Sequence, residues 1–404
     1  MSHLKLGVLA VLLACGVTSP GWNSDRPLER VEQRLEIAQY VFDVKVPAGY
    51  VVEHLTGAMS APRILTFHHN GDLYAGSNSG HIYHLQPPYT QPKPIIRVRG
   101  YPHSIAFRAG KMLIALTSGL YEMPYQPGQR PSGDSIKLLA AIPGGPGHSS
   151  RTVKIGPDNK IYLSLGISGN CSDEYLHRSY PPTQRRGGVM VLDESLEPPE
   201  WKTFGSGLRN PVGFSWHPDT REMYASNNGP DHLGYEQPPE VFAHVTPGSF
   251  HGMPWFQMRD GSLAEESCIT RAPPRPQDEV ALPVATFPSR SAPMDVTFAQ
   301  AETVSGIKRG DAIVALKGSW ATLPDGGGNG DPATRRPPRI VAVQFNAGKA
   351  TSVVDLVTGF QLADGRRWAR PVGVAFGPEG ALYFTSDTAL EGLYRLRKAA
   401  DNKR

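Results

Sequence analysis

Two polar phrases contain side chains suited to proton transfer and to holding an oxygen anion. His148 follows Gly-Pro-Gly in the segment 145–151. Because the ordinary pKa of histidine lies near neutrality, His148 is a candidate general base; the alternative is a loop histidine that only bonds to backbone. Arg209 offers a planar fork of N–H donors, and Asn210 offers a donor and an acceptor, unless both simply hold a turn together. No Gly-x-Ser-x-Gly elbow occurs, so a serine nucleophile has less support.

Two further phrases suit a cation and an anion. Gly229 and Pro230 lie in the turn 227–231, whose backbone carbonyls could bind a hard cation such as calcium, although such turns are common. Lys317 closes an apolar segment three residues before Trp320, where its ammonium could pair with an anionic ligand or merely reach solvent. No His/Cys group has zinc spacing, and no phosphate loop or dinucleotide fingerprint occurs, so a nucleotide cofactor is not expected.

Short strands and many turns must position these residues. The 404 residues include 43 glycines and 38 prolines, which interrupt helices. A phrase of two alternating strands around a Pro, Asn, Asp or Gly turn recurs six times, at 62–74, 102–114, the segments ending in 156–162 and 217–224, 292–314 and 370–383. Spacings of roughly 40 to 90 residues fit four-stranded blades with loop insertions. The sequence therefore predicts an all-β fold, a six-bladed β-propeller; the alternative is a two-sheet sandwich.

The propeller is expected to span residues 46–396, with long loops at one face. The insertions 166–200, 228–290 and 320–337 are rich in Pro, Gly and polar residues and leave the hairpins at equivalent ends. We expect them to gather at one mouth of the central channel and to form the binding face. The charged tail 397–404 is expected to lie outside the core.

The N-terminus predicts export. Lys5 precedes the apolar run 6–14, which is too short to span a bilayer as a mature helix and is typical of a secretory signal in residues 1–15. The segment ending at Cys15 also resembles a lipobox, so Cys15 is either lipidated or lost by ordinary cleavage. The expected location is the periplasm or cell envelope, with residues 16–45 as a leader and membrane contact only through an anchor at Cys15.

Charge and cysteine content restrict the partners. Lys and Arg number 41 against 37 Asp and Glu, a net +4, and no run of five basic residues occurs. Nucleic acid is therefore not an expected partner. In an oxidising compartment Cys171 and Cys268 remain as a pair, and the sequence leaves open whether they are bridged.

Taken together and in this order, these phrases resemble the glucose/sorbosone dehydrogenase family, exported six-bladed propellers that use pyrroloquinoline quinone (PQQ) and calcium. The resemblance runs from about residue 46 to 396 and is most specific from 207 to 231. The stretch 247–255 is similar to a Gly-rich Trp-Pro phrase of the family, and 315–320 to its Gly-Ser-Trp phrase.

The resemblance implies a role for each matching residue. His148 would take the proton from the C1 hydroxyl of a sugar as hydride passes to the quinone, and Arg209 would hydrogen-bond the reactive quinone oxygen. The carbonyls of Gly229 and Pro230 would ligate calcium. The residues implied in holding the cofactor are Asn210, Lys317, Arg370 and, in place of a family glutamine, Arg63.

Several positions depart from the family pattern. Gly147 stands where some relatives have Asp before the histidine, Arg290 begins a phrase that is often His-Ser-Ala-Pro, and no second arginine stands two residues from Arg370. The resemblance implies a small sugar substrate, an aldose or sorbosone-type sugar, and an external electron acceptor, a cytochrome or a quinone. The alternatives are a non-catalytic propeller that binds carbohydrate or protein, and a calcium-dependent sugar lactonase.

Overall fold

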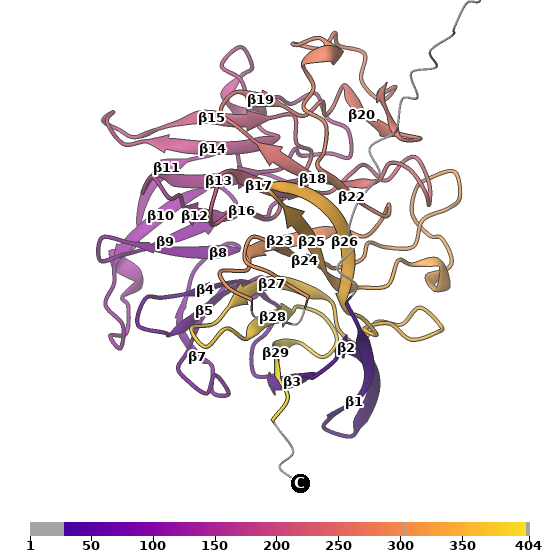
Figure 1. The fold of residues 1–404 in the computed structure, drawn as a ribbon. Coiled ribbons are helices and arrows are strands. Elements are labelled where there is room, and N and C mark those ends of the chain that lie inside the picture. Colours follow the sequence, from indigo (N-terminus) through magenta and orange to yellow (C-terminus); the bar gives the residue numbers. More distant parts are fainter. Residues whose placement is uncertain (1–27, 303, 305, 401–404) are drawn as a thin grey trace, which may run out of the picture.

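Antiparallel strands form the six predicted blades, arranged in sequence order around a ring (Figure 1). The computed structural model describes residues 28–302, 304 and 306–400. From the innermost strand outward, blades 1 to 3 consist of β4 (Pro62–Phe67), β5 (Leu73–Ser77), β6 (His81–Leu85), β7 (Lys93–Arg97); β8 (Ser104–Arg108), β9 (Lys111–Leu116), β10 (Gly119–Pro124), β11 (Lys137–Ala141); and β12 (Val153–Ile155), β13 (Ile161–Leu165), β14 (Gly188–Asp193), β15 (Glu200–Ser206), with β19 (Ser249–Phe250) added.

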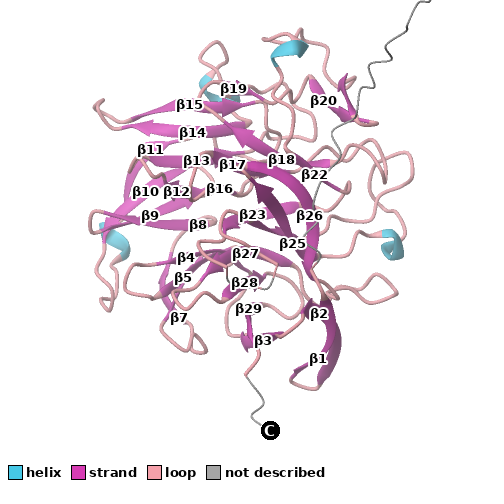
Figure 2. Ribbon diagram, in the orientation of Figure 1, coloured by secondary structure: helices cyan, strands magenta, loops and turns pink. Residues whose placement is uncertain are grey.

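Blades 4 to 6 follow the same plan. They consist of β16 (Phe214–Trp216), β17 (Met223–Asn227), β18 (Glu240–Val245), β22 (Ala285–Phe287); β23 (Pro293–Phe298), β24 (Ala312–Leu316), β25 (Arg339–Asn346), β26 (Lys349–Val357); and β27 (Pro371–Phe376), β28 (Leu382–Ser386), β29 (Gly392–Lys398), β3 (Tyr50–Thr56). The remaining elements are the hairpins β1 (Arg30–Ile37)–β2 (Tyr40–Pro47) and β20 (Phe256–Arg259)–β21 (Ser262–Glu265), and the 3₁₀ turns η1 (Gly133–Ser135), η2 (Pro182–Gln184), η3 (Gln277–Glu279) and η4 (Pro332–Thr334) (Figure 2).

The ring closes through the N-terminal part of the described chain. Strand β3 pairs antiparallel with β29 and supplies the outer strand of blade 6, while innermost strands β27 and β4 lie in contact. Each predicted hairpin forms the first two strands of one blade. The six-bladed prediction is therefore confirmed, and the sandwich alternative is wrong.

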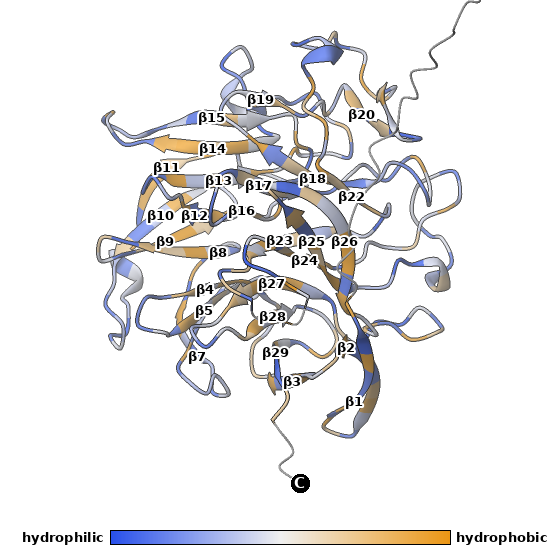
Figure 3. Cartoon of the chain, viewed as in Figure 1, coloured by the Kyte–Doolittle hydropathy of each residue, from blue (hydrophilic) through white to orange (hydrophobic). Residues whose placement is uncertain are grey.

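The apolar core lies between blades rather than at one centre. Strands β5, β13, β17, β24 and β28 are buried along their whole length, because each blade packs a neighbour against both of its faces. Six clusters of buried side chains each join two successive blades. Figure 3 shows the same division, with hydrophobic colour concentrated on the strands and hydrophilic colour frequent in the loops.

Polar side chains also join each blade to the next. One such bond crosses every blade boundary: Thr66 Oγ1 to Ile105 O, Ser104 Oγ to Arg151 O, Thr152 Oγ1 to Val212 O, Ser226 Oγ to Met294 O, Val374 N to Asp295 Oδ2 and Thr385 Oγ1 to Arg63 O. These bonds, five of them buried, fix the innermost strands relative to one another, so residues that flank those strands are placed on a rigid frame.

The expected leader is wrong for residues 30–45. Strands β1 and β2 form a hairpin, and its inward side chains join the core between blades 5 and 6, namely Leu35, Ile37, Val44 and Val46. Backbone bonds between Lys45 and Thr358 attach it to the segment after β26. The charged outward face of this hairpin is what makes its sequence resemble a solvated leader. The predicted signal at 1–15 and residues 16–27 of the leader lie outside the described residues.

The propeller boundaries shift slightly from those predicted. Strand β29 continues to Lys398, two residues into the expected tail, because its last residues pair with the start of β3. The predicted insertion 166–200 contains β14, and 228–290 contains β18, the hairpin β20–β21 and β22, so both are less irregular than expected. Among residues 28–302, 304 and 306–400, no helix is long and apolar enough to cross a membrane.

The three insertions meet at one face, as predicted. Backbone bonds link Gly327 to Asp231, and side-chain bonds link Asn170 to His232 and Arg271 to Asp173. A disulfide joins Cys171 to Cys268, with Cα atoms 6.1 Å apart, so the pairing left open by the sequence is present.

Candidate functional site

The site lies at the end of the ring where the innermost strands begin. A proline stands at or shortly before the start of five of these strands: Pro62, Pro102, Pro211, Pro293 and Pro371. Proline has no N–H to offer a ladder and therefore suits a strand's first residues. In successive blades, the residues next to these prolines lie at the mouth of the central channel. Together with residues that follow the second strands, they line an open cavity of about 480 Å³.

Cations dominate the lining of this cavity. Its charged residues are Arg63, Lys317, Arg335, Arg367 and Arg370, and no carboxylate among the described residues lines it. Asn210 adds a side-chain amide, and Trp320 stands at the cavity with 59% of its surface exposed. Such an excess of fixed positive charge attracts a ligand that carries several negative charges.

Asp387, which sequence reasoning missed, organises two of these cations. Its Oδ2 accepts from Lys317 Nζ at 2.6 Å and also from Arg63 Nη1. Burial would raise the pKa of Asp387, but Arg63 and Lys317 lower it to about 2, so the carboxylate is ionised. Burial and the neighbouring charges of Arg63 and Arg370 lower the pKa of Lys317 to about 7. A single acid thus fixes two cations without neutralising the cavity.

Two arginines from the loop before β27 bind one backbone carbonyl. Arg370 donates through Nη2 to Gly318 O at 2.5 Å, and Arg367 donates through Nη1 to the same oxygen at 3.2 Å. Arg367 thus lines the same cavity as Arg370, three residues before it in the chain. In the described part of the chain, the buried Nε atoms of Arg63 and Arg335 have no hydrogen-bond partner. These unpaired donors beside the cavity suit an anionic ligand.

His148 is held as a neutral imidazole. Its Nδ1–H donates to Ile167 O at 2.6 Å, which leaves the lone pair on Nε2. Arg151 and Arg186 donate to the backbone carbonyl of His148, at 2.6 and 3.3 Å. Burial lowers the pKa of His148 to about 4, with Arg209 and these two arginines contributing. The free nitrogen can therefore accept a proton at neutral pH.

Two glycines let the His148 loop approach its neighbours. Gly147 has a φ of +88°, and a Cβ there would collide with the carbonyl oxygen of Ser168. A Cβ on Gly166 would lie 2.7 Å from both Asn210 Oδ1 and the Cβ of His148. The aspartate that precedes the histidine in some relatives cannot be accommodated here, since L side chains rarely adopt this conformation.

Arg209 is positioned by Asn170, another residue that sequence reasoning missed. Arg209 Nε donates to Asn170 O and Nη2 to Asn170 Oδ1, both at 2.7 Å, and Nη1 donates to Asn228 O at 3.3 Å. A guanidinium has five N–H groups, so two remain for a ligand. Arg209 is only 4% exposed and does not itself line the 480 Å³ cavity, although Asn210 does.

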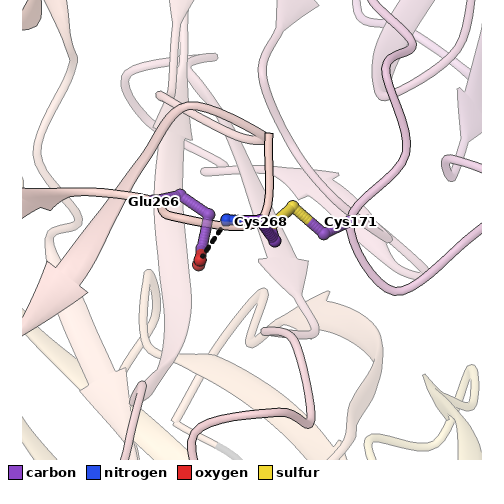
Figure 4. A group of neighbouring side chains, drawn as sticks. All are labelled: Cys171, Glu266 and Cys268. Carbon is purple, nitrogen blue, oxygen red and sulfur yellow. Dashed lines mark hydrogen bonds between the residues drawn. A yellow bond between two sulfur atoms is a disulfide. The ribbon is translucent and has the colours of Figure 1, made fainter. Parts of the chain in front are cut away.

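The disulfide anchors the residue next to Asn170. Figure 4 shows the bond between Cys171 and Cys268, with the Glu266 carboxylate accepting from the Cys268 backbone N–H. Within the described residues, this is the one group of His, Cys, Asp and Glu ligand atoms that lie within 4.8 Å of one another. Because its sulfurs are bonded together, it is a covalent staple, and it gives no support to the carboxylate-bound metal that a lactonase requires.

The predicted calcium ligands do not fit calcium. Gly229 and Pro230 line a separate small cavity of about 40 Å³ rather than the cationic one. The Pro230 carbonyl accepts a hydrogen bond from Arg290 Nη2, and Arg290 Nη1 pairs with the Asp231 carboxylate. A carbonyl that already faces a buried guanidinium cannot also face a divalent cation without strong repulsion.

The structure brings together four of the eight predicted site residues. Arg63, Asn210, Lys317 and Arg370 come together on one cavity, although they come from four blades and lie up to about 300 residues apart. His148 lies two residues from Ser150, another lining residue. Neither Asp387 nor Asn170 stands in a phrase that the sequence analysis singled out. The former follows the second strand of blade 6 as Lys317 follows that of blade 5, and this equivalence is the signal that could have found it.

The chain matches the TrAA12-like family over residues 44–249, about half of its length. It belongs to that family. The resemblance to quinone-dependent sugar dehydrogenases is thereby confirmed at the level of the family and the fold. An uncharacterized protein of Borreliella burgdorferi is 24% identical to this TrAA12-like chain over 366 residues, covering 85% of the chain and 88% of that protein.

Solved structures share the six-bladed architecture. A family AA12 carbohydrate-active enzyme of Trichoderma reesei is 19% identical with a TM-score of 0.73, over 88% of this chain and 97% of that one. The holo PQQ domain of pyranose dehydrogenase from Coprinopsis cinerea is 20% identical with a TM-score of 0.69, over the same shares. The PQQ-bound aldose sugar dehydrogenase of Streptomyces coelicolor is 15% identical with a TM-score of 0.58, over 87% and 99%.

Proposed function

We propose that this TrAA12-like chain is an exported PQQ-dependent sugar dehydrogenase that oxidises an aldose or sorbosone-type sugar at C1. The cationic cavity is the single observation that carries the proposal. PQQ is a planar tricarboxylate, and a lining of five cations without a carboxylate matches that charge. Similar propellers that contain PQQ support the choice of this anion over others.

The residues of this cavity would hold the cofactor by its anionic and carbonyl groups. Arg63, Lys317 and Arg370 present charges fixed by Asp387 and by the Gly318 carbonyl, so little ordering is needed on binding. When bound, PQQ supplies the acceptor for the two electrons of sugar oxidation.

His148 acts as the base in this proposal. Its Nε2 receives the proton of the sugar's C1 hydroxyl, while the bond from Nδ1 to Ile167 O keeps the ring in the tautomer that can do so. A pKa of about 4 keeps the imidazole neutral, and an anion bound nearby raises that pKa, which strengthens the base. Arg209 is oriented by Asn170 and offers its two remaining N–H groups to the reacting oxygen on which negative charge develops.

Export and anchoring are part of the proposal and rest on the sequence. The signal at 1–15 and the lipid-anchor cysteine Cys15 lie outside the described residues. The disulfide between Cys171 and Cys268 supports an oxidising compartment such as the periplasm. An external cytochrome or quinone would then take the electrons from the reduced enzyme.

Dye-linked oxidation of a panel of aldoses tests the function. Purified chain is incubated with PQQ, and reduction of an artificial acceptor is followed for each sugar, with free PQQ and chain without PQQ as controls. We expect saturable turnover only in the complete mixture. Sugar binding without any dye reduction would replace the proposal with the non-catalytic propeller, and hydrolysis of a sugar lactone without PQQ would replace it with the lactonase.

A further inference from the structure

Arg290 occupies the position beside the Gly229–Pro230 turn that a metal would need. The side chain is 3% exposed, and its guanidinium donates to the Pro230 carbonyl and the Asp231 carboxylate. A third, longer bond of 3.4 Å reaches Gln237 O. Three oxygens of the kind that calcium prefers are therefore already bound by one resident cation.

The backbone around Arg290 holds the guanidinium in this place. Arg290 has a φ of +65°, an uncommon conformation for a residue with a side chain. Backbone bonds fix it, because Ser319 N donates to Arg290 O at 2.8 Å and Gly318 N donates to Ser291 O at 2.7 Å. Gly318 and Ser319 follow Lys317 directly, so the backbone that carries the Arg290 guanidinium is bonded to the wall of the cationic cavity.

Glu240 ties the turn to the Arg290 segment. Its buried carboxylate accepts from Gly229 N at 2.5 Å and from Ala292 N at 3.3 Å. The ionisable groups at this point are the acids Asp231 and Glu240 and the arginines Arg290 and Arg209, and burial raises the pKa of Glu240. A calcium ion there would add two positive charges beside two buried arginines, and it would have to displace Arg290 from Pro230 O.

We propose that Arg290 takes the place of calcium in this chain, so that the anionic cofactor binds without a divalent cation. The inference rests on the proposed function for the identity of the anion, but not for the exclusion of calcium. Guanidinium groups suit this task because they are always charged and bind two oxygens at once. Replacing Arg290 with an uncharged side chain should free Pro230 O and Asp231 for a metal.

Two measurements on the whole chain test the exclusion of calcium. Calorimetric titration and thermal unfolding, each with calcium alone, are made on the wild type, Arg290→Gln and Arg309→Gln. Arg309 is an exposed arginine paired with Asp219 and serves as the matched control. We expect no calcium binding and no shift in the unfolding midpoint for the wild type and the control, and both effects in Arg290→Gln.

The prediction that the wild type does not bind calcium can still be tested if Arg290→Gln fails to fold. In that case Arg290→Lys, which keeps the charge, is expected to fold and to remain unresponsive to calcium. Calcium binding by the wild type that Asp231→Asn abolishes would overturn the inference.

A PQQ titration with and without a chelator separates this inference from the proposed function. Coupled ligands typically change each other's affinity by about 5–150-fold, whereas we expect a factor near one for the wild type and a calcium-dependent affinity for Arg290→Gln. PQQ binding that the chelator abolishes and calcium restores would overturn the inference while supporting the function. Failure of PQQ to bind under either condition would overturn the function, and the calcium titrations would still decide the role of Arg290.

Discussion

The two ends of the innermost strands use charge differently. At the turn end, where the first two strands of a blade meet, two acids bind a tyrosine of their own hairpin: Asp158 accepts from the Tyr162 hydroxyl at 3.0 Å, and Glu379 accepts from Tyr383. At the mouth, residues from different blades meet, and Asp387 binds cations from blades 1 and 5. Bonds within one hairpin keep the fold, whereas bonds between residues of different blades make one asymmetric site.

The largest effect is expected from His148 at the mouth. Removal of a general base costs about 10²–10⁴-fold in turnover, so His148→Ala should lose sugar oxidation by that factor while it retains PQQ binding. His68→Ala is the control, because His68 is a turn-end histidine bonded to Asn70. Rates in a dye-linked assay measure both variants. Full turnover by His148→Ala would remove this residue from the mechanism.

The pH dependence of turnover is a second test of His148 as the base. A base must be unprotonated, so turnover is present above the pKa of His148 and is lost as pH falls through it. That pKa is about 4 without a ligand and should be higher when an anion is bound. We expect the acid limb of the kcat profile to lie above pH 4 and to be absent from the residual activity of His148→Ala. An acid limb unchanged in that variant would assign it to another group.

Lys317 should make cofactor affinity depend on pH. Its pKa is about 7, and a bound anion favours the charged form, so binding takes up a proton above pH 7. The Kd for PQQ should be flat below pH 7 and rise by up to about tenfold per pH unit above it. Lys317→Arg, whose charge does not titrate here, should give a flat profile. The same slope in that variant would show that another group binds the proton.

Asn170 should act on turnover through Arg209. In Asn170→Ala, Arg209 loses the Nη2 bond to the side-chain oxygen but keeps the Nε bond to the backbone carbonyl, and we expect kcat to fall about tenfold, less than the 10²–10³-fold cost of deleting an electrostatic donor. KM and the unfolding midpoint should change little, and Asn170→Asp, which keeps the acceptor oxygen, should restore most of kcat. A loss of stability parallel to the loss of kcat would show a merely structural role.

The smallest effect is expected at the turn end. Asp158→Asn weakens the bond to the Tyr162 hydroxyl, which should cost about 1 kcal/mol of unfolding free energy. Turnover and PQQ affinity should not change. Denaturant unfolding and the dye-linked assay measure the two quantities. A clear loss of activity would contradict the division of roles between the two ends.

This division also explains what the sequence could predict. The turn phrases recur with the same chemistry, so the six blades and their hairpins could be predicted from spacing alone. Arg63, Lys317 and Arg370 could be placed in one site only through the resemblance, because their proximity depends on ring closure. Asp387 and Asn170 were missed, since their importance lies in bonds to residues far along the chain. The β1–β2 hairpin was missed because one of its faces is strongly charged.

A PQQ titration of the signal-less chain, followed by the absorbance of the cofactor, tests the central claim that the cationic mouth is a cofactor site. We predict saturable binding of one PQQ per chain. Removing single cavity cations, in Lys317→Ala and Arg370→Ala, should weaken it, whereas the turn-end variant Asp158→Asn should leave it unchanged. Absence of binding, or binding equally tight in all variants, would contradict the account.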